Sequence, residues 1–163
     1  MYSKDLEKAL KKYIDSLSKY GKEELRQLLQ QASSVDRYSL LMNVRGDKYS
    51  GTTGLHKAAL YNDLETMKYM LEEFTVDEKY DVLKIQIKNN CVSALHYAAG
   101  YCPSSTLTYL LADLSQQQKY NLFQLQKIDR NTPLHVAASK PNPEAIQAIL
   151  ASLSLPLLPE RLR

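Results

Sequence analysis

The chain has 163 residues, which is long enough to bury about 70% of its unfolded surface and to fold without a metal or a disulfide. Its 21 basic and 18 acidic residues are spread along the sequence and give a formal charge of +3, which disfavours a dedicated nucleic-acid binder. The two cysteines, Cys91 and Cys102, are too few for a disulfide framework and lie in no metal-binding spacing, so we interpret them as reduced thiols in a cytosol-like compartment.

Residues 1–44 are predicted to form a helix pair followed by a connector. The start, MYSKDLEKALKK, is charged and amphipathic, and no run approaches 18 apolar residues, which excludes a secretory signal peptide and a membrane span. Apolar residues recur at helical spacing on both sides of Gly21. These residues are Leu6, Ala9, Leu10, Tyr13, Ile14 and Leu17, then Leu25, Leu28, Leu29 and Ala32. We expect an N-terminal helical cap or a divergent first repeat.

A short phrase around each histidine then recurs. The three phrases are GLHKAAL, ALHYAAG and PLHVAAS, and their histidines, His56, His96 and His135, are 40 and 39 residues apart. Tyrosines in the segments before each phrase keep nearly the same period, at positions 38, 80 and 120. The repeating unit therefore includes the connector as well as the phrase.

Each phrase has the chemistry of a helix start. Thr132 is suited to an N-cap and Pro133 to the first helical position, where the missing N–H costs nothing. His135 follows three residues after the cap, so its ring can reach back as Glu does in a capping box. Thr53 and Ser93 offer the same cap to the other two histidines.

Two further helical patterns complete each unit. Apolar residues at helical spacing after each Ala-Ala pair predict a second helix. These residues are Leu64, Met67, Leu71 and Phe74 in the first unit, Leu107, Leu110, Leu111 and Leu114 in the second, and Ile146, Ile149, Leu150 and Leu153 in the third. The connectors TVDEKYDVL and SQQQKYNLF open with capping-box pairs, which predicts an added helical turn or short helix between units.

The phrase Thr-Pro-Leu-His-x-Ala-Ala, followed by a second helix, resembles the ankyrin repeat. NTPLHVAAS matches in full, whereas the first unit has Gly54 for Pro and the second has Cys91 for the turn Gly. The period exceeds the family's usual length of about 33 residues. The resemblance implies an all-α helical repeat solenoid with short β-hairpin-like fingers, an N-terminal helical cap and three repeats over residues 45–153. Residues 154–163 are expected to be a C-terminal tail or a truncated next connector.

The resemblance also implies where partners bind: at the finger tips and at the concave-facing end of each first helix. The finger-tip candidates are Lys48, Tyr49, Lys88, Asn89 and Ile128. The first-helix candidates are Tyr61, Tyr101 and Lys140. We expect Tyr61 and Tyr101 to form an aromatic pair flanked by the tip lysines, which suits a partner with acidic and apolar features. Alternatively, the tip lysines only discourage strand pairing.

No phosphate loop, H-E-x-x-H pair or nucleophile-elbow phrase is present, so we expect no catalysis, no cofactor and no metal. Stacked units lie roughly 10 Å apart, too far for the histidines to share a zinc ion. We expect a monomeric, cytoplasmic protein-binding module that contacts neither nucleic acid nor membrane. The family resemblance leaves two settings, a cellular scaffold or a module delivered into a host cytosol. The alternative is the recognition portion of a larger enzyme or receptor.

Overall fold

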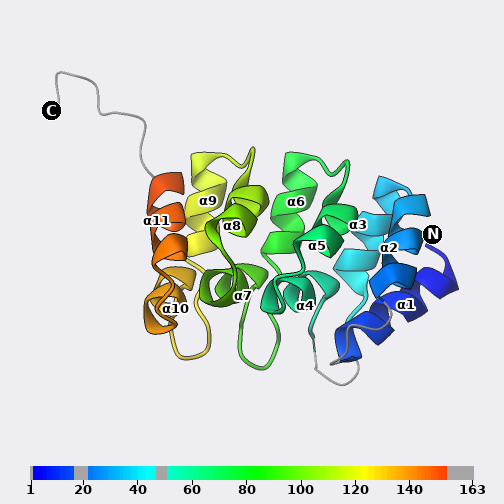
Figure 1. The fold of residues 1–163 in the computed structure, drawn as a ribbon, viewed down its shortest axis with the longest axis horizontal. Coiled ribbons are helices and arrows are strands. Elements are labelled where there is room, and N and C mark those ends of the chain that lie inside the picture. Colours follow the sequence, from blue (N-terminus) through cyan, green and yellow to red (C-terminus); the bar gives the residue numbers. More distant parts are fainter. Residues whose placement is uncertain (1, 17–21, 47–50, 154–163) are drawn as a thin grey trace, which may run out of the picture.

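The structure, a computed structural model, describes residues 2–16, 22–46 and 51–153. This part of the chain contains eleven helices that stack side by side into an elongated array (Figure 1). The array is an all-α repeat solenoid, which confirms the fold class expected from the sequence.

The N-terminal layer consists of α1 (Lys4–Asp15), α2 (Lys22–Gln31) and α3 (Ser34–Asn43). The helix α1 begins after Ser3, whose side chain accepts the Leu6 backbone N–H. Its apolar face is buried because it packs against α2 and α4. Of the predicted apolar face, Leu17 lies outside the described residues.

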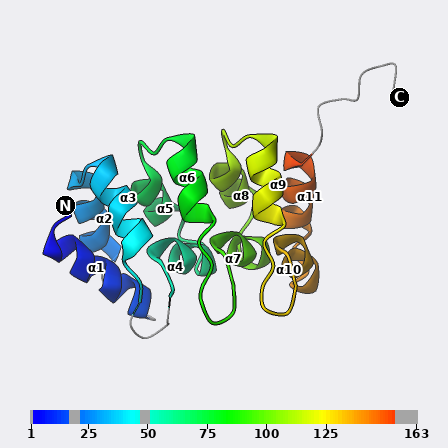
Figure 2. The same ribbon diagram turned by 180° about the vertical axis from the view of Figure 1, so that it is seen from behind.

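The following layers repeat one arrangement. The first helices are α4 (Gly54–Leu60), α7 (Ala94–Tyr101) and α10 (Pro133–Ser139). The second helices are α5 (Leu64–Leu71), α8 (Ser104–Leu111) and α11 (Pro143–Ser152). The extra residues of the long period form the connector helices α6 (Val76–Leu83) and α9 (Gln116–Phe123), which continue the row begun by α3 (Figure 2).

Close stacking of the first helices depends on the alanine pairs. Ala58, Ala59, Ala98 and Ala99 are fully buried, and α7 lies between α4 and α10. Small side chains let the backbones approach, so each layer buries a face that it could not bury alone.

The loops between layers are hairpin-like fingers that project from one edge of the array (Figure 1). In the second finger the Ile87 N–H donates to the Val92 carbonyl at 2.8 Å, and in the third the Lys127 N–H donates to the Asn131 carbonyl at 2.9 Å. The equivalent turn residues Gly51, Cys91 and Arg130 all have a positive φ, of 83°, 58° and 68°. Cys91 thus holds a backbone conformation that favours glycine.

Close packing explains why Gly54 stands where the ankyrin phrase has Pro. A Cβ atom there would lie 2.6 Å from Leu10 Cδ1 and 2.9 Å from Met70 Cε. The N-terminal helix α1 therefore sits so close to the start of α4 that the usual Pro at this position would collide with buried side chains.

The apolar residues that predict the last second helix are not all buried. Leu150 is 54% exposed, whereas the equivalent Leu71 and Leu111 are 5% and 4% exposed and belong to the hydrophobic core. The helix α11 packs against α7, α8 and α10, and it is the last helix of the described residues. The second helices α5 and α8 end before Phe74 and Leu114. The residues just before these two, Glu73 and Asp113, adopt left-handed backbone conformations that end a helix.

Candidate partner-binding surface

Each buried histidine ring connects its own helix cap to the next finger. His56 Nδ1 accepts the Thr53 backbone N–H at 3.3 Å and lies 2.7 Å from Thr53 Oγ1. Because Nδ1 accepts this bond, the ring proton sits on Nε2, which donates to the Val92 carbonyl at 3.1 Å. His96 repeats the arrangement between Ser93 and the Asn131 carbonyl, at 2.8 and 3.0 Å.

The third histidine makes only half of this connection. His135 Nδ1 lies 2.7 Å from Thr132 Oγ1, and the ring caps α10 in the same way. Its side chain is exposed, and its Nε2 has no hydrogen-bond partner among the described residues.

Burial keeps the inner rings neutral. It lowers the pKa of His56 to about 4 and also lowers the pKa of His96. The Cys102 thiol lies 3.1 Å from the Ala59 carbonyl oxygen, and burial raises its pKa to about 11, which disfavours the reactive thiolate. Residues 2–16, 22–46 and 51–153 hold no group of three or more His, Cys, Asp or Glu side chains placed to bind a metal ion.

Two exposed aromatic side chains lie at the C-terminal ends of the first helices. Tyr61 and Tyr101 occupy equivalent positions at the ends of α4 and α7, and each is 49% exposed. Lys140 holds the same position after α10 and is also exposed. We call these three residues the tyrosine–lysine row.

The two tyrosines are each paired with a lysine. Lys57 Nζ lies 4.6 Å from the centre of the Tyr61 ring, and Lys140 Nζ lies 5.4 Å from the centre of the Tyr101 ring. The two rings make no ring–ring contact with each other among the described residues; His56 and Tyr97 form the aromatic contact between α4 and α7. The expected aromatic pair is therefore replaced by two cation–π contacts.

The finger tips lie at the opposite ends of the first helices. Lys88 and Asn89 are exposed, and Ile128 is 72% exposed. Lys127 forms an ion pair with Asp129 at 3.2 Å, so the expected basic stripe does not extend unpaired to the third finger. Lys48 and Tyr49 lie outside the described residues. Among the described residues, the lysines beside the Tyr61 and Tyr101 rings are Lys57 and Lys140.

The comparison with protein families decides what this repeat is. A sequence model described as ankyrin repeats matches residues 16–121 in three copies. The chain belongs to the ankyrin repeat family. No curated protein matches the sequence. The match begins ahead of α2 and therefore takes in helices of the N-terminal layer, whereas the phrase NTPLHVAAS lies beyond its end.

Membership defines the general role of the array. Ankyrin repeats are generally protein–protein interaction modules. Across the described ankyrin repeats and their N-terminal layer, no helix has the length and apolar character needed to cross a membrane.

Two residues beside the tyrosine–lysine row were missed from the sequence. Lys57 and Tyr97 stand one helical turn before Tyr61 and Tyr101, on the same face of their helices. Lys57 is buried because its amine also donates to the Ser16 carbonyl at the end of α1. The spacing of four residues could have identified both.

A buried polar network joins the N-terminal layer to the first ankyrin repeat, and no pattern in the sequence predicted it. Asp63 accepts hydrogen bonds from the Tyr13 hydroxyl at 2.9 Å, from Arg26 at 2.8 Å and from the Thr66 hydroxyl at 2.7 Å. Burial raises the pKa of Asp63, but these hydrogen bonds and the nearby Lys22 outweigh that effect and hold the pKa below its usual value. The ionised carboxylate thus fastens α1 and α2 to the start of α5.

Proposed function

We propose that this chain is a non-catalytic adaptor or scaffold module that binds a protein partner through the tyrosine–lysine row. The observation that carries the proposal is the repetition of an exposed, oriented aromatic ring at one register position, Tyr61 and Tyr101. Tyrosine offers a large contact area at a low cost in side-chain entropy, and it is common at the centres of interfaces.

The lysines hold these rings in place before a partner arrives. Lys57 lies over the Tyr61 ring and is itself fixed by the end of α1. Lys140 reaches across from α10 to the Tyr101 ring. A side chain ordered in advance loses less entropy on binding, so such rings are efficient anchors.

The charge of the row indicates the chemistry of the partner. Lys140 is exposed beside Tyr101, and the described carboxylates that form ion pairs do so with other basic residues. A partner segment that combines apolar side chains with carboxylates would satisfy both the rings and the lysine. The exposed tips at Lys88, Asn89 and Ile128 would contribute rim contacts.

Site-specific photo-crosslinking tests this proposal. We would place a photoreactive phenylalanine analogue at Tyr61 or Tyr101, irradiate the chain in a cell lysate, and identify the crosslinked proteins. The same analogue at Tyr120 is the matched control, because Tyr120 is similarly exposed but lies on α9, in the connector row. We expect one protein to be enriched at both row positions and not at the control.

Affinity measurements with that protein complete the test. Replacement of Tyr61 and Tyr101 together by Ala should weaken binding at least about tenfold, since truncation of one such anchor often costs about 2 kcal/mol. Helicity should not change. Binding that survives the double replacement, or crosslinks that are as strong from Tyr120, would place the contact surface elsewhere.

A further inference from the structure

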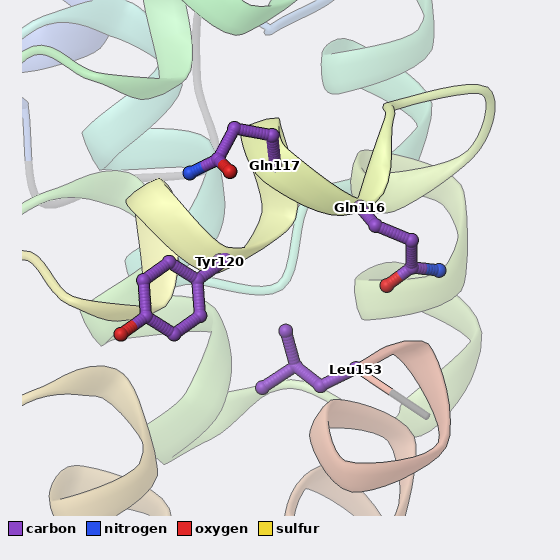
Figure 3. Close-up of a pocket in the computed structure, with 4 residues that line it drawn as sticks. All are labelled: Gln116, Gln117, Tyr120 and Leu153. Carbon is purple, nitrogen blue, oxygen red and sulfur yellow. The ribbon is translucent and has the colours of Figure 1, made fainter. Parts of the chain in front are cut away.

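The described array ends in an open groove beside the last connector helix. Gln116, Gln117 and Tyr120 line it from α9, and Leu153 lines it from the end of α11 (Figure 3). The groove has a volume of about 490 Å³. Tyr120 is 54% exposed, whereas the equivalent Tyr38 and Tyr80 are half-buried.

The inner layers show what covers the same face. The Tyr38 hydroxyl on α3 donates to Asp81 on α6 at 3.0 Å. One layer on, the Tyr80 hydroxyl on α6 accepts from Asn121 on α9 at 3.1 Å. Each connector tyrosine thus bonds to a carboxylate or amide of the next connector, and Tyr120 stands at the position where a third such contact would form.

A second hydrogen bond joins the same two connector helices, α6 and α9. The Gln118 amide on α9 donates to Asp77 on α6 at 3.2 Å. Gln117 occupies on α9 the position that Asp77 occupies on α6, and it faces the groove. The groove is therefore a continuation of an interface that the structure already contains, and its polar partners are defined by that interface.

The sequence after Leu153 matches a connector at two positions, whereas Leu157 replaces the capping-box residue and Pro159 replaces the connector tyrosine. In the two connectors after the first repeats, the N-cap residue is Thr75 or Ser115, and the partner of the tyrosine, Asp81 or Asn121, follows six residues later. Ser154 follows Leu153 as Ser115 follows Leu114, and Glu160 follows Ser154 by the same six residues.

We propose that residues 154–163, which lie outside the described residues, bind this groove and that Glu160 accepts a hydrogen bond from the Tyr120 hydroxyl. The four leucines of the segment supply apolar surface for Leu150 and Leu153. Pro156 and Pro159 supply no backbone N–H donors.

Tethering favours this occupant over a separate molecule. Four described residues line the groove, whereas each side of a stable complex contributes about 20 to 30 residues. Leu153 both lines the groove and directly precedes the segment, which gives the segment an effective concentration on the order of millimolar. A weak contact is then sufficient.

Amide hydrogen exchange, measured by NMR on the full chain and on a chain shortened to residue 153, tests the proposal. We expect amides of α9 to exchange about tenfold faster in the shortened chain, while amides of α6 change less than about twofold. Unchanged amide exchange in α9 would overturn the proposal. Protection of α9 that rises with the concentration of the full chain would also overturn it, because a second copy of the chain would then occupy the groove.

Point substitutions test the specific contact without removal of the segment. Tyr120→Phe and Glu160→Ala should each raise α9 exchange by about threefold, and the double variant should be no worse than either single variant, because both remove the same hydrogen bond. Tyr101→Phe is the matched control and should leave α9 exchange and the effect of Glu160→Ala unaltered. Independent, multiplicative effects of Tyr120→Phe and Glu160→Ala would show that the two side chains do not meet.

Discussion

Replacement of His56 by Ala should destabilise the array more than the same change at His135. His56 is 1% exposed. Its removal leaves the Thr53 N–H without an acceptor and takes one of two donors from the Val92 carbonyl, which keeps its bond from the Ile87 N–H. A buried polar group left unsatisfied costs about 1 to 3 kcal/mol and a lost hydrogen bond about 0.5 to 1.5 kcal/mol, so the two together should cost about 1.5 to 4.5 kcal/mol. His135 makes only the cap contact at an exposed site, and its loss should cost about 0.5 to 1 kcal/mol.

Urea unfolding at pH 7.5, followed by circular dichroism, measures the difference. His96→Ala serves as a second buried case, because its ring reaches the Asn131 carbonyl in the same way. Exchange of the α4 and α7 amides reports whether the loss is local to the altered layer. Equal costs at His56 and His135 would refute the idea that the connection to the next finger supplies most of the stabilisation.

The remaining predictions concern pH, backbone conformation and the N-terminal layer. The folded pKa of His56 is about 4, below the unfolded value of about 6.5, so the unfolded state binds more protons between these two pH values. The free energy of unfolding should therefore fall by about 3 kcal/mol as the pH drops from 6.5 to 4. Urea midpoints measured across this range should move much less in His56→Leu. Cys91→Gly should stabilise the chain by about 1 kcal/mol because φ is positive there, and a lower melting temperature would contradict this. Asp63→Ala should lower the free energy of unfolding by about 3 to 5 kcal/mol, because it leaves the buried Tyr13 hydroxyl and the Arg26 guanidinium without their acceptor. Amide hydrogen exchange should rise first in α1 and α2, and faster exchange confined to α10 and α11 would contradict this prediction.

The caps and the repeat could be predicted because their chemistry is local. A residue such as Thr132 and a ring three positions later define a helix start by themselves, and the period of 39 to 40 residues is visible in the sequence. The connector helices were predictable for the same reason, since capping boxes open both α6 and α9.

Features that depend on the neighbouring layer could not be predicted in this way. The need for Gly54 follows from the position of Leu10 on α1, and the role of Asp63 follows from Tyr13 and Arg26, which lie far away in sequence. Tyr61 stands at the register position read from the sequence, and the spacing of four residues points to Lys57, but the contact that orders Lys57 at the end of α1 depends on the neighbouring layer.

The histidine connection also determines how such an array can change length during evolution. The rings of His56 and His96 each donate to a finger carbonyl of the next unit, Val92 and Asn131. Duplication or deletion of a whole period keeps every donor opposite an acceptor, wherever the breakpoints fall. A partial insertion within the first helix or finger would displace the carbonyl from the ring, so selection should favour gene rearrangements in steps of 39 or 40 codons.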